Sequence, residues 1–70
     1  MLDASRLKGK IVEKNTNIEE LSRKIGINYA TFYRKLKNNS FSIEEADKIA
    51  AALSLTNEEA TAIFFSQFVA

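Results

Sequence analysis

The chain has 70 residues, enough for one small domain. Its formal net charge is +1 and 46% of its residues are hydrophobic, as expected for a globular protein with a modest core. It contains neither cysteine nor histidine, which excludes disulfides, thiolate metal sites and the most common general base. The longest apolar run, Ile49 to Leu53, is far shorter than the roughly 20 residues of a membrane span, and the polar start resembles no secretory signal. We therefore expect a single cytoplasmic, non-enzymatic domain over residues 1–70, without cofactor or metal.

Apolar residues recur at three- and four-residue spacing and proline is absent. This pattern predicts five short helices and no sheet. The first helix is expected from Asp3 to Asn15, with Asp3 as its N-cap and with Leu7 and Ile11 on its inner face.

The second helix is expected over Ile18 to Ile25, with Asn17 as N-cap and Leu21 facing inward. Gly26 then fits the left-handed position that ends a helix at low cost. A third helix is expected from Tyr29 to about Lys37. Because only three residues separate these two helices, they must cross at a steep angle.

Two capping boxes predict the starts of the last two helices, at Ser42 to Glu45 and at Thr56 to Glu59. The fourth helix should end at Leu53, and Phe41 before it should fold back onto the core. The expected inner face of the fourth helix carries Ile43, Ala46, Ile49, Ala50 and Leu53. The expected inner face of the fifth carries Ala60, Ile63 and Phe64.

The charges divide between the two halves of the chain. Residues 1–41 hold nine basic and four acidic residues, a charge of +5, whereas residues 42–70 hold one basic and five acidic residues, a charge of −4. A polyanion would be attracted to the first half. The alternative interpretation is that these charges only solvate exposed helix faces.

The segment 18–36, IEELSRKIGINYATFYRKL, carries the most informative pattern. Leu21 anchors its first helix, and Ser22 provides a small side chain where two crossing helices approach closely. After the turn glycine, Phe32 and Leu36 are spaced as inward anchors. This is the helix-turn-helix pattern of DNA-binding domains, in which the second helix lies in the major groove.

From roughly Leu7 to Phe65 the chain resembles the Cro/repressor-type (XRE-like) helix-turn-helix family. The stretches LKGKIVEKN, EELSRKIGIN, TFYRKLKNN and SIEEADKIAAALSLTNEEA are most similar to short regulators of bacteriophages and prophages. The resemblance implies an all-α, five-helix lambda-repressor-like domain whose helix-turn-helix spans about 18–37. It also implies a sequence-specific transcriptional regulator that binds an operator in double-stranded DNA. Two departures are Ile18, where the family often has a phosphate-clamping Gln, and Lys35, where it often has a branched apolar residue.

The resemblance also suggests residues that contact DNA. The candidate base readers are Asn28, Tyr29, Ala30, Tyr33 and Arg34. Asn28 either reads an adenine or only caps the helix, Arg34 grips a guanine or a phosphate, and the tyrosines either enter the groove or act as half-buried struts. The candidate phosphate contacts are Asn17, Thr31, Lys35, Lys37, Asn38 and Asn39.

After Glu59 the chain carries no charge, and Phe65, Phe68 and Val69 are not needed to dock the fifth helix. Exposed aromatic residues favour a partner surface. We expect residues 60–70 to mediate a two-fold dimer that places two third helices about 34 Å apart on a palindromic site. Alternatively, Phe68 packs against the first helix and the tail frays.

A second functional class is a protein-interaction module of the same fold, an antirepressor or modulator that binds another phage regulator. An enzyme is disfavoured because adjacent helical carboxylates point about 100° apart. The glutamate pairs are better explained by their place in the first turns of helices. These pairs are Glu19/Glu20, Glu44/Glu45 and Glu58/Glu59. We expect no small-molecule substrate and no membrane partner.

Overall fold

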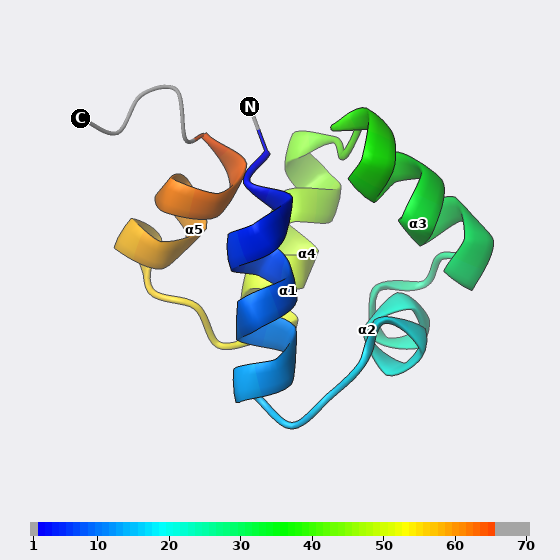
Figure 1. The fold of residues 1–70 in the computed structure, drawn as a ribbon, viewed down its shortest axis with the longest axis horizontal. Helices are drawn as coiled ribbons and strands as arrows, with labels where there is room; N and C mark the ends of the chain where they lie inside the picture. Colours follow the sequence, from blue (N-terminus) through cyan, green and yellow to red (C-terminus); the bar gives the residue numbers. More distant parts are fainter. Residues whose placement is uncertain (1, 66–70) are drawn as a thin grey trace.

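The computed structural model describes residues 2–65, which form five α-helices (Figure 1). In chain order these are α1 (Ala4–Glu13), α2 (Ile18–Ile25), α3 (Tyr29–Asn38), α4 (Ile43–Ala52) and α5 (Asn57–Phe64). α4 packs against α2 and α5, and α1 packs against α5. α2 and α3 lie on one side of α1 and α5 on the other (Figure 1). The described residues contain no strand, so the all-α, five-helix architecture predicted from the sequence is confirmed.

The helix starts depend on side-chain caps. The Asp3 carboxylate accepts a hydrogen bond from the Arg6 backbone N–H at 3.0 Å, and the Asn17 amide oxygen accepts one from Glu20 at 2.9 Å. Both predicted capping boxes are present, at the start of α4 and at the start of α5. Each cap satisfies a backbone donor that has no partner within its helix.

α1 is shorter than the sequence predicted, because it ends at Glu13 rather than Asn15. Asn15 adopts a left-handed backbone conformation with φ of 57°. The Thr16 N–H then donates to the Ile11 carbonyl at 3.1 Å, which closes the end of the helix. Asn tolerates this conformation better than most residues, so the chain turns here toward α2.

The core forms where the inner faces of all five helices meet. Phe32 is its largest fully buried side chain. Phe41 folds back onto the core as predicted, with its ring centroid 5.0 Å from that of Phe32 in an edge-to-face arrangement. The buried apolar residues of this cluster are Leu7, Ile11, Leu21, Ile25, Phe32, Leu36, Ile49, Leu53 and Ile63.

The predicted inner face of α4 is correct for its later turns and wrong for its first residue. Ala46, Ile49 and Leu53 are buried, whereas Ile43 is 78% exposed. Ile43 lies on the side of α4 that faces α5, at the rim of a hollow that it shares with Phe64 and Phe65. No other part of residues 2–65 covers Ile43 at this point, because α5 ends here.

A backbone bond and an ion-pair cluster connect α1 to α5. The Asp3 N–H donates to the Ile63 carbonyl at 2.6 Å. Lys10 of α1 pairs with Glu59 of α5 and, at 2.9 Å, with Glu13. Hydrogen bonding to Lys10, together with the Thr56 N–H, lowers the pKa of Glu59 from 4.5 to about 2. Hydrogen bonding to Glu59 and to Glu13 raises the pKa of Lys10, so the charged forms of Lys10 and Glu59 are favoured in the folded state.

The depressed pKa of Glu59 predicts how the stability of the domain depends on pH. A carboxylate with a lowered folded-state pKa adds stability above its unfolded-state pKa and loses it as pH falls. The contribution should therefore be complete above about pH 4.5 and disappear towards pH 2. In urea denaturation series, Glu59→Gln should flatten the acid-side loss of stability, whereas Glu58→Gln, on the exposed neighbour, should retain the wild-type profile. Identical pH profiles for both variants would contradict this assignment.

Candidate nucleic-acid interface

The turn between α2 and α3 sets the angle between these helices. Gly26 adopts a left-handed conformation with φ of 79°. A Cβ atom placed there would meet no atom within 4 Å, so the backbone angle rather than lack of space favours glycine. The Ile27 N–H donates to the Ser22 carbonyl at 3.0 Å. Ser22 is 1% exposed and donates its hydroxyl to the Ile18 carbonyl at 2.7 Å, so its small side chain fits inside the packed motif.

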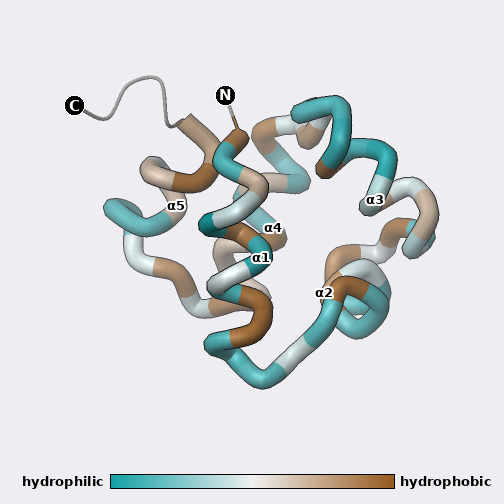
Figure 2. The backbone as a smooth tube through the Cα atoms, in the orientation of Figure 1, coloured by the Kyte–Doolittle hydropathy of each residue, from teal (hydrophilic) through white to brown (hydrophobic). Residues whose placement is uncertain are grey.

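α3 buries two side chains on one face and exposes polar side chains on the opposite face. Phe32 and Leu36 are buried, as the sequence predicted. At about 100° per residue, Ala30, Arg34 and Lys37 fall on one line that points away from these anchors, and all three are exposed. We call this line the outward face of α3. Colouring by hydropathy shows that α3 is largely hydrophilic, whereas the end of α5 is hydrophobic (Figure 2).

Tyr29 and Tyr33 form an aromatic pair along one flank of the outward face. Their ring centroids are 4.9 Å apart with an interplanar angle of 69°. Tyr29 and Tyr33 are 47% and 44% exposed, so neither tyrosine is a core residue. Hydrogen bonding with Tyr33 is the main cause of a raised pKa at Tyr29, and partial burial and negative charge nearby act in the same direction. The Tyr29 hydroxyl therefore stays protonated, as a hydrogen-bond donor, at neutral pH.

Asn28 caps α3, because its side-chain oxygen accepts a hydrogen bond from the Ala30 N–H at 2.7 Å. A bidentate contact from asparagine to adenine needs both the amide oxygen and the amide nitrogen. Capping already uses the oxygen. The geometry therefore favours the capping role, one of the two that the sequence left open.

The ammonium group of Lys35 contacts α4 instead of facing solvent. It lies 2.6 Å from a Glu45 carboxylate oxygen, and both side chains are largely covered. This contact and the Ser42 N–H lower the pKa of Glu45 below its ordinary value of 4.5. In this structure Lys35 therefore connects α3 to α4, and its expected contact with a phosphate stays a prediction.

The other expected phosphate contacts lie in three separate places. Asn17 is at the start of α2, where Glu19 and Glu20 occupy the first turn and offset the positive end of the helix. Thr31 is half-buried on the flank of α3 opposite the tyrosines, about 200° around the helix from each. The end of α3 brings three exposed polar residues together, namely Lys37, Asn38 and Asn39.

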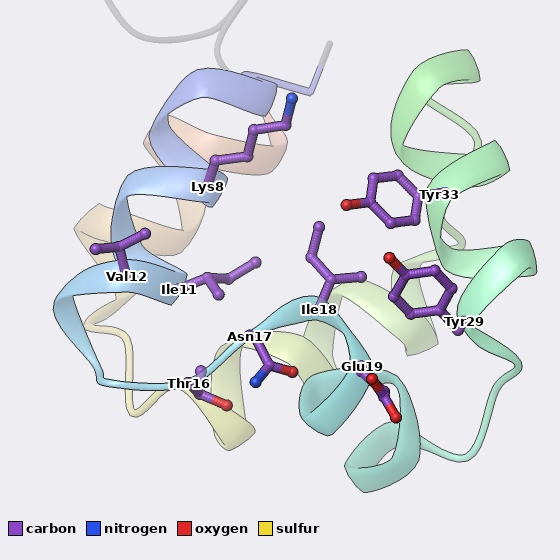
Figure 3. Close-up of a pocket in the computed structure, with 9 residues that line it drawn as sticks. All are labelled: Lys8, Ile11, Val12, Thr16, Asn17, Ile18, Glu19, Tyr29 and Tyr33. Atoms are coloured by element: carbon purple, nitrogen blue, oxygen red, sulfur yellow. The ribbon is translucent and has the colours of Figure 1, made fainter.

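A groove of about 480 Å³ runs between α1, the start of α2 and α3 (Figure 3). We call it the α1–α3 groove. Sequence reasoning missed it, although the four-residue spacing of two exposed residues on α1, Lys8 and Val12, was a visible signal. Its lining comprises Lys8, Ile11, Val12, Thr16, Asn17, Ile18, Glu19, Tyr29 and Tyr33.

Comparison with known families agrees with this geometry. The family model described as a Cro/C1-type HTH DNA-binding domain matches residues 6–62, most of the chain and all of α2 and α3. The chain belongs to this family. No curated protein and no solved structure gave a match. The Cro/C1-type domain is a DNA-binding domain of transcription regulators, so α3 and its flanks are the candidate DNA interface. Within residues 2–65, no helix is both long and apolar enough to span a membrane.

The contact between Lys35 and Glu45 predicts an energetic coupling between α3 and α4. Lys35→Met retains the aliphatic stem, and Glu45→Gln retains an oxygen for the Ser42 cap. Each variant should lower the free energy of unfolding, and a double-mutant cycle in urea should give a coupling of about 1 kcal/mol. The exposed pair Lys48 and Glu44, 3.6 Å apart, serves as the control and should give a smaller coupling. Additive effects of Lys35→Met and Glu45→Gln would contradict the connection.

Proposed function

We propose that the domain is an operator-binding transcriptional regulator, of the short phage and prophage type, with α3 in the major groove of duplex DNA. The observation that carries the proposal is the exposed outward face of α3, opposite two buried anchors. A helix that is fixed on one side and polar on the other can enter a groove without losing its hold on the core.

The exposed residues of α3 differ in the base contacts that their side chains can make. Arg34 points directly away from the core and carries a guanidinium that can bind guanine O6 and N7 in a bidentate manner. Ala30 offers only a methyl group, which suits contact with a thymine methyl. Tyr29 and Tyr33 add hydroxyl donors and ring edges on the flank.

The proposed phosphate contacts come from the C-terminal end of α3 and from one of its flanks. Lys37, Asn38 and Asn39 lie together at the end of α3, and Thr31 lies on its far flank. Such contacts fix the register of the protein on the duplex without reading sequence. The +5 charge of residues 1–41 attracts the duplex, and the −4 charge of residues 42–70 opposes docking by the other half.

The proposed function requires no catalytic activity. By occupying an operator it would exclude the polymerase or a competing regulator from the same DNA. Its effect on transcription then depends on affinity and on the position of the operator.

The proposal predicts that Arg34 and Tyr33 determine affinity for the preferred site. With a duplex selected from a random library, Arg34→Ala should weaken binding about 10-fold or more, and Tyr33→Ala should also weaken it. Lys48→Ala, on α4, should bind as the wild type does. With about five phosphates neutralised by basic side chains of residues 1–41, log K should fall with log salt concentration with a slope of about −4 to −5. Fluorescence anisotropy measures both quantities.

If both Arg34→Ala and Tyr33→Ala retain wild-type affinity, α3 does not read the groove. The interaction-module class, which binds another regulator instead of DNA, would then replace the proposal.

We further propose that the domain pairs through the hydrophobic end of α4 and α5. Phe65 is 39% exposed and shares a hollow with the exposed Ile43 and with Phe64. A two-fold axis there would form a self-complementary contact and present two copies of α3 to half-sites about 34 Å apart. The other expected pairing residues, Phe68 and Val69, lie outside the described residues.

This pairing predicts that a charge placed in the hollow converts the dimer to a monomer. Wild-type protein should sediment as a dimer, and Ile43→Glu and Phe65→Glu should each shift it to monomer. Val12→Glu places the same charge at another exposed aliphatic residue, which is 74% exposed on α1, and should remain dimeric. A monomeric wild type, with or without operator DNA, would eliminate this interface.

A further inference from the structure

The α1–α3 groove has a hydrophobic floor and a rim rich in hydrogen-bond donors. Val12 and Ile18 contribute aliphatic surface, with 74% of Val12 exposed. Figure 3 shows that the Lys8 ammonium and the hydroxyls of Tyr29 and Tyr33 turn toward the space above Ile18. A ligand in this groove would therefore meet apolar surface below and donors at the edge.

The polar residues of the lining favour an anionic ligand. Lys8 and Asn17, like the two tyrosines, carry hydrogen-bond donors, whereas the Thr16 hydroxyl already donates to the Glu20 carboxylate at 2.9 Å. Glu19 is the single carboxylate among the lining residues, and in Figure 3 it lies at the opposite end of the groove from Lys8. The end of the groove near Lys8 therefore carries positive charge and no carboxylate from the lining.

The groove is continuous with the surface that faces DNA in the proposed function. Tyr29 and Tyr33 form one of its walls and are also the flank of the outward face of α3. A duplex that receives α3 in its major groove has a sugar–phosphate strand on each side of that helix. One of these strands must therefore pass the tyrosine flank.

We propose that the α1–α3 groove seats the sugar–phosphate backbone of one DNA strand beside α3. In this arrangement Lys8 and the tyrosine hydroxyls bind a phosphate, while Val12 and Ile18 support the adjoining deoxyribose. The inference rests on the proposed function, and it assigns to α1 a contact that the helix-turn-helix motif itself does not contain. It also compensates for the start of α2, where Ile18, Glu19 and Glu20 provide neither a clamping amide nor free positive potential.

The ammonium contact is tested by the salt dependence of binding. Lys8→Met removes the charge and retains most of the aliphatic stem, and Lys14→Met makes the same change at an exposed lysine that does not line the groove. Lys8→Met should weaken binding to every duplex by a similar factor and make the slope of log K against log salt concentration about one unit less steep. Lys14→Met should leave the slope as in the wild type.

The hydrophobic floor is tested by a matched pair of aspartates. Val12→Asp places a carboxylate in the groove, and Ala51→Asp places one at an exposed residue of α4 that lines neither the groove nor the proposed pairing hollow. Val12→Asp should weaken DNA binding at least 10-fold, whereas Ala51→Asp should bind as the wild type does. Circular dichroism melting of each variant checks that the fold is retained. In the wild type, the Val12 methyl resonances should shift on titration with duplex.

The outcomes separate this inference from the proposed function. If Lys8→Met retains the wild-type slope and Val12→Asp retains the wild-type affinity, while Arg34→Ala loses affinity, α3 reads DNA and the groove does not hold a strand. The groove would then be a surface for a protein partner. If Arg34→Ala and Tyr33→Ala also bind normally, both proposals fail together.

Discussion

The buried ring of Phe32 holds α3 in the domain, and the DNA interface depends on it. α3 has only two buried residues, Phe32 and Leu36, so nearly every other side chain of the helix is available to a ligand. Removing a buried phenylalanine side chain costs about 3–5 kcal/mol, a large part of the 5–15 kcal/mol that stabilises an ordinary domain. Because only two of its side chains are buried, α3 depends on close packing around both of them. The edge-to-face contact between Phe41 and Phe32 provides part of that packing.

The two capping boxes have a second function that their sequence signature does not contain. In each box, one carboxylate oxygen of the glutamate accepts the N–H of its own cap residue, and the other binds a lysine of a different helix. Glu45 thereby connects α4 to Lys35 of α3, and Glu59 connects α5 to Lys10 of α1. Two glutamates of the acidic second half thus hold α1 and α3 of the basic first half in place, and they also offset part of its charge.

The local elements could be predicted from the sequence, whereas contacts between distant residues could not. Asp3, Asn17 and Gly26 act within a few residues of their own position, so their identities suffice to place the caps and the turn. The exposure of Ile43 depends on where α5 ends, and the partner of Lys35 depends on how α4 crosses α3. The α1–α3 groove likewise required the relative placement of three helices, since no segment of the chain contains more than part of its lining.

The placement of Tyr29 and Tyr33 also makes the protein its own optical reporter. The chain contains two tyrosines and no tryptophan. Both phenol rings stand at the candidate interface, 4.9 Å apart and partly open to water. Tyrosine fluorescence from the unlabelled protein therefore originates entirely from the surface whose occupancy is in question, and no engineered fluorophore is required to observe it.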